Sequence, residues 1–516
     1  MASADHVVVI GAGIGGLVAA LRLSAAGCDV TVVDRASGPG GKMRTQPSAA
    51  GPVDAGPTVL TMRHVFDEIF AHAGFDLDQT VRLTPLPVLA RHYWADGTQL
   101  DLYPGRDRNA DAIADVFGAK AGQEFSRFAA RAARLFAAFD KPMMQSARPQ
   151  TITLALRVLR QPELLRDMAI FRSLKGMLAG SFSEPRLAQL FGRYATYVGG
   201  MPGHAPALLS LIWEAEAQGV WSVDGGMYQL ALALESAAKA RGVTFHYDSM
   251  VDEILSDAAG VCGVKADRRI WTTRKIVFNG DPRALMKGAL GPMVKQAVRG
   301  AAVEPRSLSA CVLTFAARPS GPALSHHTVF FGDDPDEEFS QIARGCLPLD
   351  PTLYLCAQDH ATAGPSDLQR FEIIMNAPPL RDTEIPDYRQ CQTHILNRCR
   401  RFGLTFDPEP GVASLTDPVM FDRLFPQSLG SLYGRSPHGL TAAMKRPTAR
   451  TGIRGLYLCG GGAHPGAGVP MAALSGRHAA ETILQDLGLT SPSRRMAMHG
   501  GTSMGGAHAA RGPSPS

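Results

Sequence analysis

A short apolar run near the start of the chain is followed by glycines and then by apolar residues at helical spacing. The run from Val7 to Ile10 is long enough for one buried strand, and the apolar positions after Gly16 recur at intervals of three and four residues. Residues 29–33 form a second apolar run that ends at Asp34. This order predicts strand, tight turn, helix and parallel strand, which is how an α/β domain begins.

Similar patterns return far along the chain, so this first domain is predicted to be discontinuous. Short strands expected at 243–247, 251–255, 276–278 and 455–459 are assigned to it. Two domains are expected because 516 residues exceed what one hydrophobic core usually supports. The predicted boundaries are 1–60, 222–285 and 451–488 for the first domain, and 61–221 and 286–450 for the second.

The second domain is predicted to combine a sheet with a layer of helices. Residues 91–94 and 99–103 alternate between apolar and polar positions, and Asp96-Gly97 between them predicts a hairpin turn. From 111 to 218 the apolar residues have helical spacing. The tail 489–516 is rich in Gly, Ser, Ala and Pro and is predicted to be disordered.

The helical stretch contains a basic amphipathic segment. Residues 141–180 hold seven Lys or Arg and two Asp or Glu, although the whole chain has a net charge of only +5. Such helices can lie in an anionic membrane surface, or they can pack on their own domain with a solvated basic face. The pattern leaves both interpretations open, and a lipid substrate would favour the first.

The glycines after the first strand have the spacing of a dinucleotide-binding turn. Gly11 permits the tight turn, Gly13 lets the backbone approach a pyrophosphate, and Gly16 lets the helix pack against the strand. The amide groups at the start of the helix then face the phosphates. Asp34 follows the glycines by about 20 residues, where an acidic side chain accepts the ribose hydroxyls. Together these features predict a dinucleotide.

A second glycine turn, 38–44, follows directly. Lys42 and Arg44 in this turn are candidates to set a positive charge against the same pyrophosphate. The alternative is a solvated basic loop without a ligand.

A third glycine-rich segment, Gly460 to Gly468, lies over four hundred residues from the first. A cofactor site built from both ends of the chain is typical of an FAD-dependent oxidoreductase. His464 in this segment is the candidate catalytic residue, expected beside the flavin. The alternative is that His464 only satisfies hydrogen bonds of its loop. The role of Asp54 also has two alternatives, because this residue can lie near the flavin or cap the following turn.

Composition excludes several other classes. The small net charge and the lack of an aromatic-basic module argue against nucleic acid as a partner. The eight cysteines form no CxxC pair and are expected to be reduced core residues, and no metal site is expected. No stretch reaches the roughly 20 apolar residues of a membrane-spanning helix. The protein is expected to be soluble, or to lie on a membrane surface.

Four motifs together resemble the bacterial phytoene desaturase family of carotenoid desaturases. They are Val9-Ile10-Gly11-Ala12-Gly13-Ile14-Gly15-Gly16, Gly40-Gly41-Lys42-Met43-Arg44, Asp54-Ala55-Gly56-Pro57-Thr58 and His464-Pro465-Gly466-Ala467-Gly468-Val469-Pro470. Residues 56–63 and 469–477 are most similar to the branch of 1-hydroxycarotenoid 3,4-desaturases, also called methoxyneurosporene dehydrogenases. The resemblance implies a two-domain α/β FAD-dependent oxidoreductase, with a Rossmann-type FAD domain and a substrate domain of a mixed sheet and helices.

The motifs and the resemblance assign FAD binding to a defined set of residues. Val251 is included because related flavoproteins hold the adenine with the backbone at this position. The expected FAD-binding residues are Gly11, Gly13, Gly15, Gly16, Asp34, Arg35, Gly41, Lys42, Arg44, Asp54, Pro57, Thr58, Val251, Gly461, Gly462, Gly468, Val469 and Pro470.

The resemblance also implies the substrate and the site of action. The expected reaction is carbon–carbon desaturation by hydride transfer to the flavin, on 1-hydroxy- or 1-methoxy-carotenoids such as 1-hydroxyneurosporene. A long apolar tunnel is expected in the second domain, opening toward the basic helical surface of the membrane-facing layer 111–218. The protein is expected to be cytoplasmic and held peripherally at the inner or photosynthetic membrane. Oxygen and a quinone remain alternative electron acceptors. Phytoene desaturation, carotenoid isomerisation without net oxidation, and a flavin-free protein that binds prenylated partners are the competing functions.

Overall fold

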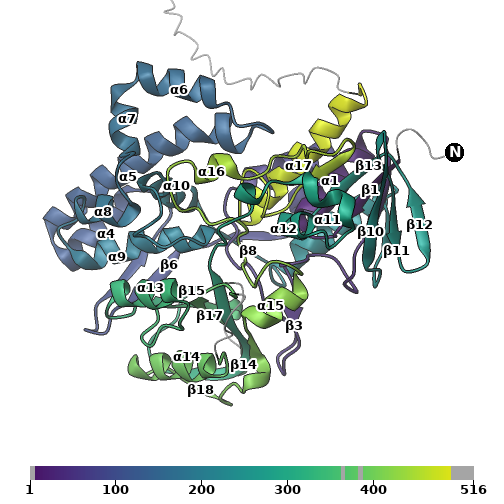
Figure 1. Cartoon of the computed structure of the whole chain (residues 1–516). Coiled ribbons are helices and arrows are strands. Elements are labelled where there is room, and N and C mark those ends of the chain that lie inside the picture. Colours follow the sequence, from purple (N-terminus) through teal and green to yellow (C-terminus); the bar gives the residue numbers. More distant parts are fainter. Residues whose placement is uncertain (1–5, 362–366, 382–386, 490–516) are drawn as a thin grey trace, which may run out of the picture.

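The computed structural model describes residues 6–361, 367–381 and 387–489, and the predicted disordered tail lies almost wholly outside these residues. A parallel five-stranded sheet forms one end of the molecule (Figure 1), in the order β20-β13-β1-β2-β9. Its strands are β1 (His6–Ile10), β2 (Asp29–Val33), β9 (Thr244–His246), β13 (Lys275–Phe278) and β20 (Leu456–Leu458). The predicted return of the chain to this sheet at 243–247, 276–278 and 455–459 is therefore confirmed.

Both faces of this sheet are covered, which explains its uninterrupted apolar strands. Val7 and Val9 of β1 belong to a core with α1 (Ile14–Ala25), α2 (Arg63–His72), α11 (Tyr228–Ala240) and α17 (Val469–Asp486). Val8 and Ile10 point into a second core on the opposite face. That core is covered by α12 (Pro282–Lys287) and by an antiparallel sheet of β10 (Val251–Asp257), β11 (Gly260–Ala266) and β12 (Arg269–Thr272). The strand expected at 251–255 thus belongs to this separate sheet.

A larger, mostly antiparallel sheet forms the other end. Its strands are, in order, β18 (Thr405–Asp407), β14 (Ser309–Ser320), β17 (Gln369–Ala377), β16 (Leu353–Ala357), β15 (His327–Phe330), β6 (Ala90–Tyr93) and β7 (Gln99–Leu102), with β19 (Leu415–Thr416) paired to β14. The β6–β7 pair confirms the predicted hairpin. Shorter pairs are β3 (Thr45–Gln46) with β4 (Val53–Asp54), and β5 (Leu83–Pro85) with β8 (Trp221–Val223).

A disulfide in this part corrects one expectation from the sequence. Cys311 on β14 is joined to Cys391 on α14 (Gln390–Arg401), so not all cysteines are reduced. Packing of α14 on the sheet brings the two Cα atoms to 6.4 Å, within the range a disulfide spans. Sequence spacing could not reveal this, because the two residues are 80 positions apart.

Helices fill residues 107–217 and cover one side of the large sheet (Figure 1). They are α4 (Asp107–Phe117), α5 (Ala119–Phe139), η1 (Asp140–Met144), α6 (Thr151–Arg160), α7 (Pro162–Met168), α8 (Leu174–Ala179), α9 (Pro185–Gly192), η2 (Arg193–Val198), η3 (Ala207–Ser210) and α10 (Leu211–Ala217). The aromatic core of this layer contains Phe125, Phe191 and Trp213, all fully buried. On the opposite side of the large sheet lies α14, whereas α13 (Pro335–Arg344) lies on the same side as the helical layer, next to α8 and α9.

Candidate cofactor site and substrate region

The first and third glycine segments are in direct contact. A Cβ atom added to Gly15 would lie 2.7 Å from the backbone nitrogen of Gly460, and one added to Gly476 would lie 2.1 Å from the carbonyl oxygen of Gly15. Asn279, at the end of β13, joins them by donating a hydrogen bond to the Gly11 carbonyl (3.1 Å). Asn279 was not among the predicted site residues, although its position directly after a buried parallel strand could have indicated a place near the cofactor.

The second glycine turn lies against the first. Gly13 forms a bridge with Gly40, and a Cβ added to Gly41 would lie 3.1 Å from the Cα of Gly13. Gly11 has φ of +103° and Gly41 of +60°, values that favour glycine. No side chain caps the amino end of α1, so its first amide groups are available to an anion. This open backbone cradle fits the pyrophosphate of FAD.

Asp34 lies where the ribose is expected. Its carboxylate accepts hydrogen bonds from the backbone nitrogens of Ala12 (2.6 Å) and Ala36 (2.7 Å). The amide of Ser249 donates to the Asp34 carbonyl (2.9 Å), which brings the start of β10, and with it Val251, to the same end of the site. Arg35 is exposed.

Lys42 and Arg44 point away from the glycine turn toward the second domain. The ammonium of Lys42 donates to the Leu432 carbonyl (2.5 Å), and Arg44 donates to the Thr416 hydroxyl (3.1 Å). Burial lowers the pKa of Lys42 to about 8. These contacts argue against the solvated basic loop and place both cations against Leu432 and Thr416 of the predicted second domain.

Lys42 belongs to a group of cations with few acidic partners, which we call the cation group: Lys42, Arg306, Arg435 and Arg446. The charges of Arg306 and Arg446 lower the pKa of Lys42, and only Asp281 opposes them. Arg446 donates to the Gly461 carbonyl (2.9 Å), so the group borders the third glycine segment. An excess of buried positive charge is stabilised by an anionic ligand, which again fits FAD. The three arginines carried no motif and were missed.

Asp54 caps a helix. Its carboxylate accepts hydrogen bonds from the backbone nitrogens of Met227 (2.6 Å) and Tyr228 (3.2 Å) at the start of α11. It therefore caps a helix far along the chain and not the turn that follows it. Pro57 and Thr58 continue from Asp54 toward the large sheet, where Thr58 contacts the Tyr354 hydroxyl at 2.7 Å.

The side chain of His464 is fixed by contacts with neighbouring residues. Its Nε2 lies 3.0 Å from the Ser146 carbonyl oxygen, and its ring stacks on His478 with 5.8 Å between centroids. Burial lowers the pKa of His464. These contacts favour the loop-stabilising alternative over a role as a base. Gly468, with φ of +108°, precedes α17, and Val469 and Pro470 form its first turn.

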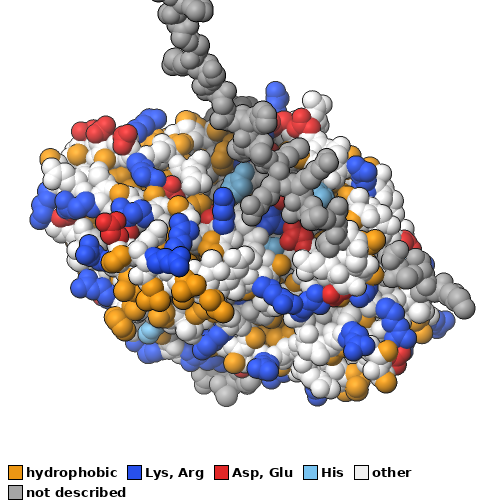
Figure 2. All heavy atoms as spheres, turned by 90° about the horizontal axis from the view of Figure 1, so that it is seen from above, with side chains coloured by type: hydrophobic (Ala, Val, Ile, Leu, Met, Phe, Trp, Pro, Cys, Tyr) orange, Lys and Arg blue, Asp and Glu red, His pale blue; other side chains and the backbone are white. Residues whose placement is uncertain are grey.

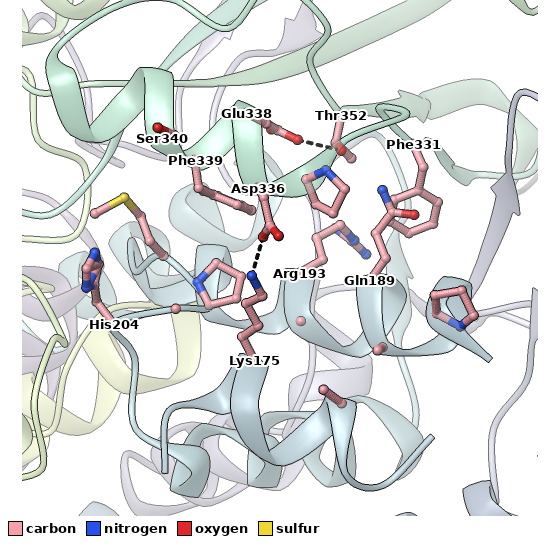
Figure 3. A pocket seen from close by; sticks show the side chains of 18 of the residues that line it. Lys175, Gln189, Arg193, His204, Phe331, Asp336, Glu338, Phe339, Ser340 and Thr352 are labelled. Atoms are coloured by element: carbon pink, nitrogen blue, oxygen red, sulfur yellow. Dashed lines mark hydrogen bonds and ion pairs between the residues drawn. The ribbon is translucent and has the colours of Figure 1, made fainter. Parts of the chain in front are cut away.

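A cavity of about 710 Å³ lies between α8, α9 and α13 (Figure 3). Phe182, Phe331 and Phe339 contribute to its lining, and Lys175 forms an ion pair with Asp336 there (2.5 Å). Arg193 also lines it. Its volume is typical of a small-molecule site. Lys175 and Ala179 of the basic segment 141–180 line this cavity, whereas no residue of α6 or α7 does.

The segment with α6 and α7 carries exposed apolar side chains. Ile152 and Leu159 are each 76% exposed and Phe171 is 95% exposed. Figure 2 shows hydrophobic side chains gathered beside Lys and Arg on this face. Among the described residues, no helix is long and apolar enough to cross a membrane.

His326, His327 and Cys356 form a group able to hold a metal ion, with ligand atoms within 4.8 Å of one another. One imidazole is already engaged, because Nδ1 of His327 lies 2.7 Å from the Tyr354 hydroxyl. The absence of a metal stays a prediction.

Comparisons with known proteins agree with this geometry. The family described as flavin containing amine oxidoreductase matches residues 14–346. A hydroxyneurosporene desaturase of Cereibacter sphaeroides is 54% identical over 93% of this chain and 98% of its own. One of Rhodobacter capsulatus is 46% identical over 94% of this chain and 99% of its own. Cyclohexylamine oxidase of Brevibacterium oxydans has the same fold, with a TM-score of 0.56 at 17% identity, over 94% of this chain and 100% of its own.

These matches span almost the whole length of the desaturases and confirm the resemblance drawn from the four motifs. They also confirm the expected fold class and FAD as the cofactor. The chain is an FAD-dependent oxidoreductase that belongs to the flavin containing amine oxidoreductase family, in the group formed by the hydroxyneurosporene desaturases.

Proposed function

We propose that the protein is a carotenoid desaturase that forms the 3,4 double bond of 1-hydroxy- or 1-methoxy-carotenoids such as 1-hydroxyneurosporene. The observation that carries this proposal is the 54% identity to a hydroxyneurosporene desaturase over nearly the full length of both chains. The contact between the glycine segments supports the further proposal that the residues assigned from the sequence hold FAD in a domain made of 1–60, 222–285 and 451–488.

The reaction removes a hydride from one carbon and a proton from its neighbour, and leaves a double bond between them. Bound FAD supplies the acceptor for the hydride. Because the adjoining polyene delocalises the developing positive charge, the protein needs only a weak base, and water can take the proton. The two electrons then pass to oxygen or a quinone. The task of the chain is to bind the substrate and orient it.

The cation group has a defined task in this scheme. Arg446 donates to the Gly461 carbonyl, and the charges of Arg306 and Arg446 act on Lys42, with Asp281 as their acidic counterpart. Their positive charge stabilises the anionic groups of the cofactor. It also favours the additional negative charge that accompanies hydride uptake.

The membrane supplies the substrate in this proposal. Carotenoids dissolve in the hydrocarbon of a bilayer, and the exposed Ile152, Leu159 and Phe171 lie next to basic residues of the same segment. Apolar side chains bordered by Lys and Arg are the usual means of binding an anionic membrane surface. We therefore propose peripheral attachment, through α6 and α7, to the membrane that holds the carotenoid.

The test is an assay of the FAD-loaded protein on liposomes that contain one carotenoid each, either 1-hydroxyneurosporene or phytoene, with oxygen or a quinone present. We expect one additional conjugated double bond in the hydroxylated carotenoid, measured by absorbance and mass. Conversion of phytoene alone would support the phytoene desaturase alternative. Isomerisation without loss of two hydrogens would contradict desaturation.

A further inference from the structure

A glutamate of the large sheet has no hydrogen-bond partner within the part of the chain that the structure describes. Glu372 on β17 is paired in register with Thr314 of β14 and Cys356 of β16, and its side chain is 0% exposed. Among the described residues, neither of its carboxyl oxygens has a partner. Leaving a buried carboxyl group without hydrogen bonds destabilises a protein. A bound ligand would remove that cost.

The neighbours of Glu372 belong to the segments that border the proposed flavin site. The negative charge of Asp54 raises its pKa, whereas Arg44 and the hydroxyl of Thr58 lower it. The Thr58 hydroxyl makes its own hydrogen bond to Tyr354. Three residues of the chain between 44 and 58 therefore converge on one buried carboxyl group of the substrate domain.

Other polar atoms close to Glu372 also lack partners. Thr58, Tyr354 and His327 form a chain with 2.7 Å between successive polar atoms. Beyond this chain, Nε2 of His327 and Nε of Arg44 are buried and unpaired within the described part of the protein. The region therefore offers hydrogen bonds to a polar group, although the proposed substrate is otherwise a hydrocarbon.

The protonation of Glu372 makes it suited to an alcohol. Burial raises its pKa well above the usual value for a glutamate, which favours the neutral acid over the carboxylate. A neutral carboxylic acid has one donor and one acceptor. It can accept from a hydroxyl or donate to it, and it can also donate to a methyl ether oxygen.

We propose that Glu372 binds the oxygen at C1 of the carotenoid and so selects hydroxylated or methoxylated substrates; this rests on the proposed function. The C1 oxygen is only a few bonds from the C3–C4 bond, so its partner must lie near the flavin. Glu372 fits this condition because it interacts with Arg44, Asp54 and Thr58, which lie at the end of the second glycine turn and in the chain segment that directly follows it. The unhydroxylated carotenoid leaves the acid unpaired and is rejected.

The test compares Glu372→Met and Glu372→Gln with the parent protein, using 1-hydroxyneurosporene and neurosporene as separate substrates. Methionine removes both hydrogen-bonding functions, whereas glutamine keeps a donor and an acceptor. For Glu372→Met we expect the ratio of kcat/KM for the hydroxylated over the unhydroxylated carotenoid to fall about 100-fold or more. Glu372→Gln should keep most of the selectivity. Glu214→Met, which alters another buried glutamate with an unpaired oxygen, on α10 and outside the cavity of Figure 3, is the matched control.

Dissociation constants for the same two carotenoids, measured from the flavin absorption spectrum, separate this inference from the proposed function. If the parent protein binds the hydroxylated carotenoid but desaturates nothing, the proposed function fails and the binding ratio still tests Glu372. Equal losses for both carotenoids in Glu372→Met, with FAD content unchanged, would overturn the role in selection. A Glu372→Gln variant as unselective as Glu372→Met would overturn it as well.

Discussion

Gly15 shows how a single residue can join the two ends of this chain. It lies in the first turn of α1, where alanine is normally the better helix former. Here the space for a Cβ is filled by the backbone nitrogen of Gly460 at 2.7 Å and by Asn279 at the same distance. Any side chain at this position must therefore push the third glycine segment away from the first.

We expect Gly15→Ala to lower FAD occupancy about tenfold or more, because the displaced backbone no longer closes around the cofactor. The ratio of absorbance at the flavin band to absorbance at 280 nm measures this. Gly411→Ala is the control, since its added Cβ would meet nothing within 4 Å and its φ is not in the left-handed region. Full occupancy in Gly15→Ala would show that the two segments need not touch.

Lys42 makes cofactor binding depend on pH. Its pKa is lowered to about 8 in the protein without cofactor, and bound anionic groups should raise it. FAD affinity is then greatest below pH 8 and falls as pH rises, by up to about tenfold per unit. Fluorescence titration at pH 7 and pH 9.5 should show this fall, and Lys42→Met should abolish it. The same pH dependence in both proteins would exclude Lys42 as its source.

For single residues, the sequence predicted which positions need a particular backbone conformation better than it predicted which partners the side chains contact. Gly11 and Gly41 were predictable because a positive φ restricts the residue type. The directions taken by Lys42 and Arg44 were not, because their partners Leu432 and Thr416 are more than 370 positions away. The roles of Glu372 and of the arginines in the cation group could not be predicted either. No local sequence pattern marks these residues, because their roles depend on tertiary contacts.

Among the elements, α6 and α7 differ from the other helices of their layer. The core of that layer is aromatic and fully buried in α5, α9 and α10, but α6 buries only Leu154 and exposes most of its remaining side chains. Tertiary packing normally provides most of the stability of short helices. An apolar surface facing this helix pair, such as a bilayer, would supply the packing that stabilises the two helices and that the rest of the protein does not supply.

We expect the combined changes Ile152→Ser, Leu159→Ser and Phe171→Ser to lower binding to anionic vesicles about tenfold or more, because inserted apolar area is lost. The melting temperature should stay nearly unchanged, since all three side chains are exposed. Co-sedimentation with vesicles measures the first effect. Leu349→Ser, at a 72% exposed site outside α6 and α7, is the control and should bind normally.

Elements with strong patterns were predicted within one or two residues. The hairpin of β6 and β7 and the parallel strands β1 and β2 are examples. The sequence placed residues 251–255 in the first domain but did not reveal that β10 pairs with β11 in a separate sheet, because an apolar strand carries no information about its partner. Periodicity likewise showed that 141–180 is amphipathic but not which residues would be left exposed.

On the scale of the whole molecule, stability depends on acids buried in the substrate domain. Glu338 of α13 is 2% exposed, accepts a hydrogen bond from Thr352 (2.8 Å), and lines the cavity of Figure 3. Burial raises its pKa to about 7. The folded state therefore holds a proton that the unfolded chain releases near pH 4.5.

For this reason the free energy of unfolding should fall as pH rises from 4.5 to about 7, by up to about 3 kcal/mol from Glu338 alone. Glu338→Gln should be more stable than the parent at pH 8 and show no such advantage at pH 4.5. Thermal unfolding at both pH values measures this, with the exposed Glu337→Gln as control. An advantage of equal size at both pH values would contradict the assignment.

The contact between Gly15 and Gly460 also has a consequence for biosynthesis. A ribosome makes the first glycine turn early, yet the backbone that covers it, including Gly476, is among the last parts of the described chain to be made. The substrate domain must therefore emerge, and much of it fold, while the nucleotide cradle is still open on one side. FAD binding is thus expected late in synthesis of the chain. Fragments that end before residue 460 should bind no FAD and remain colourless.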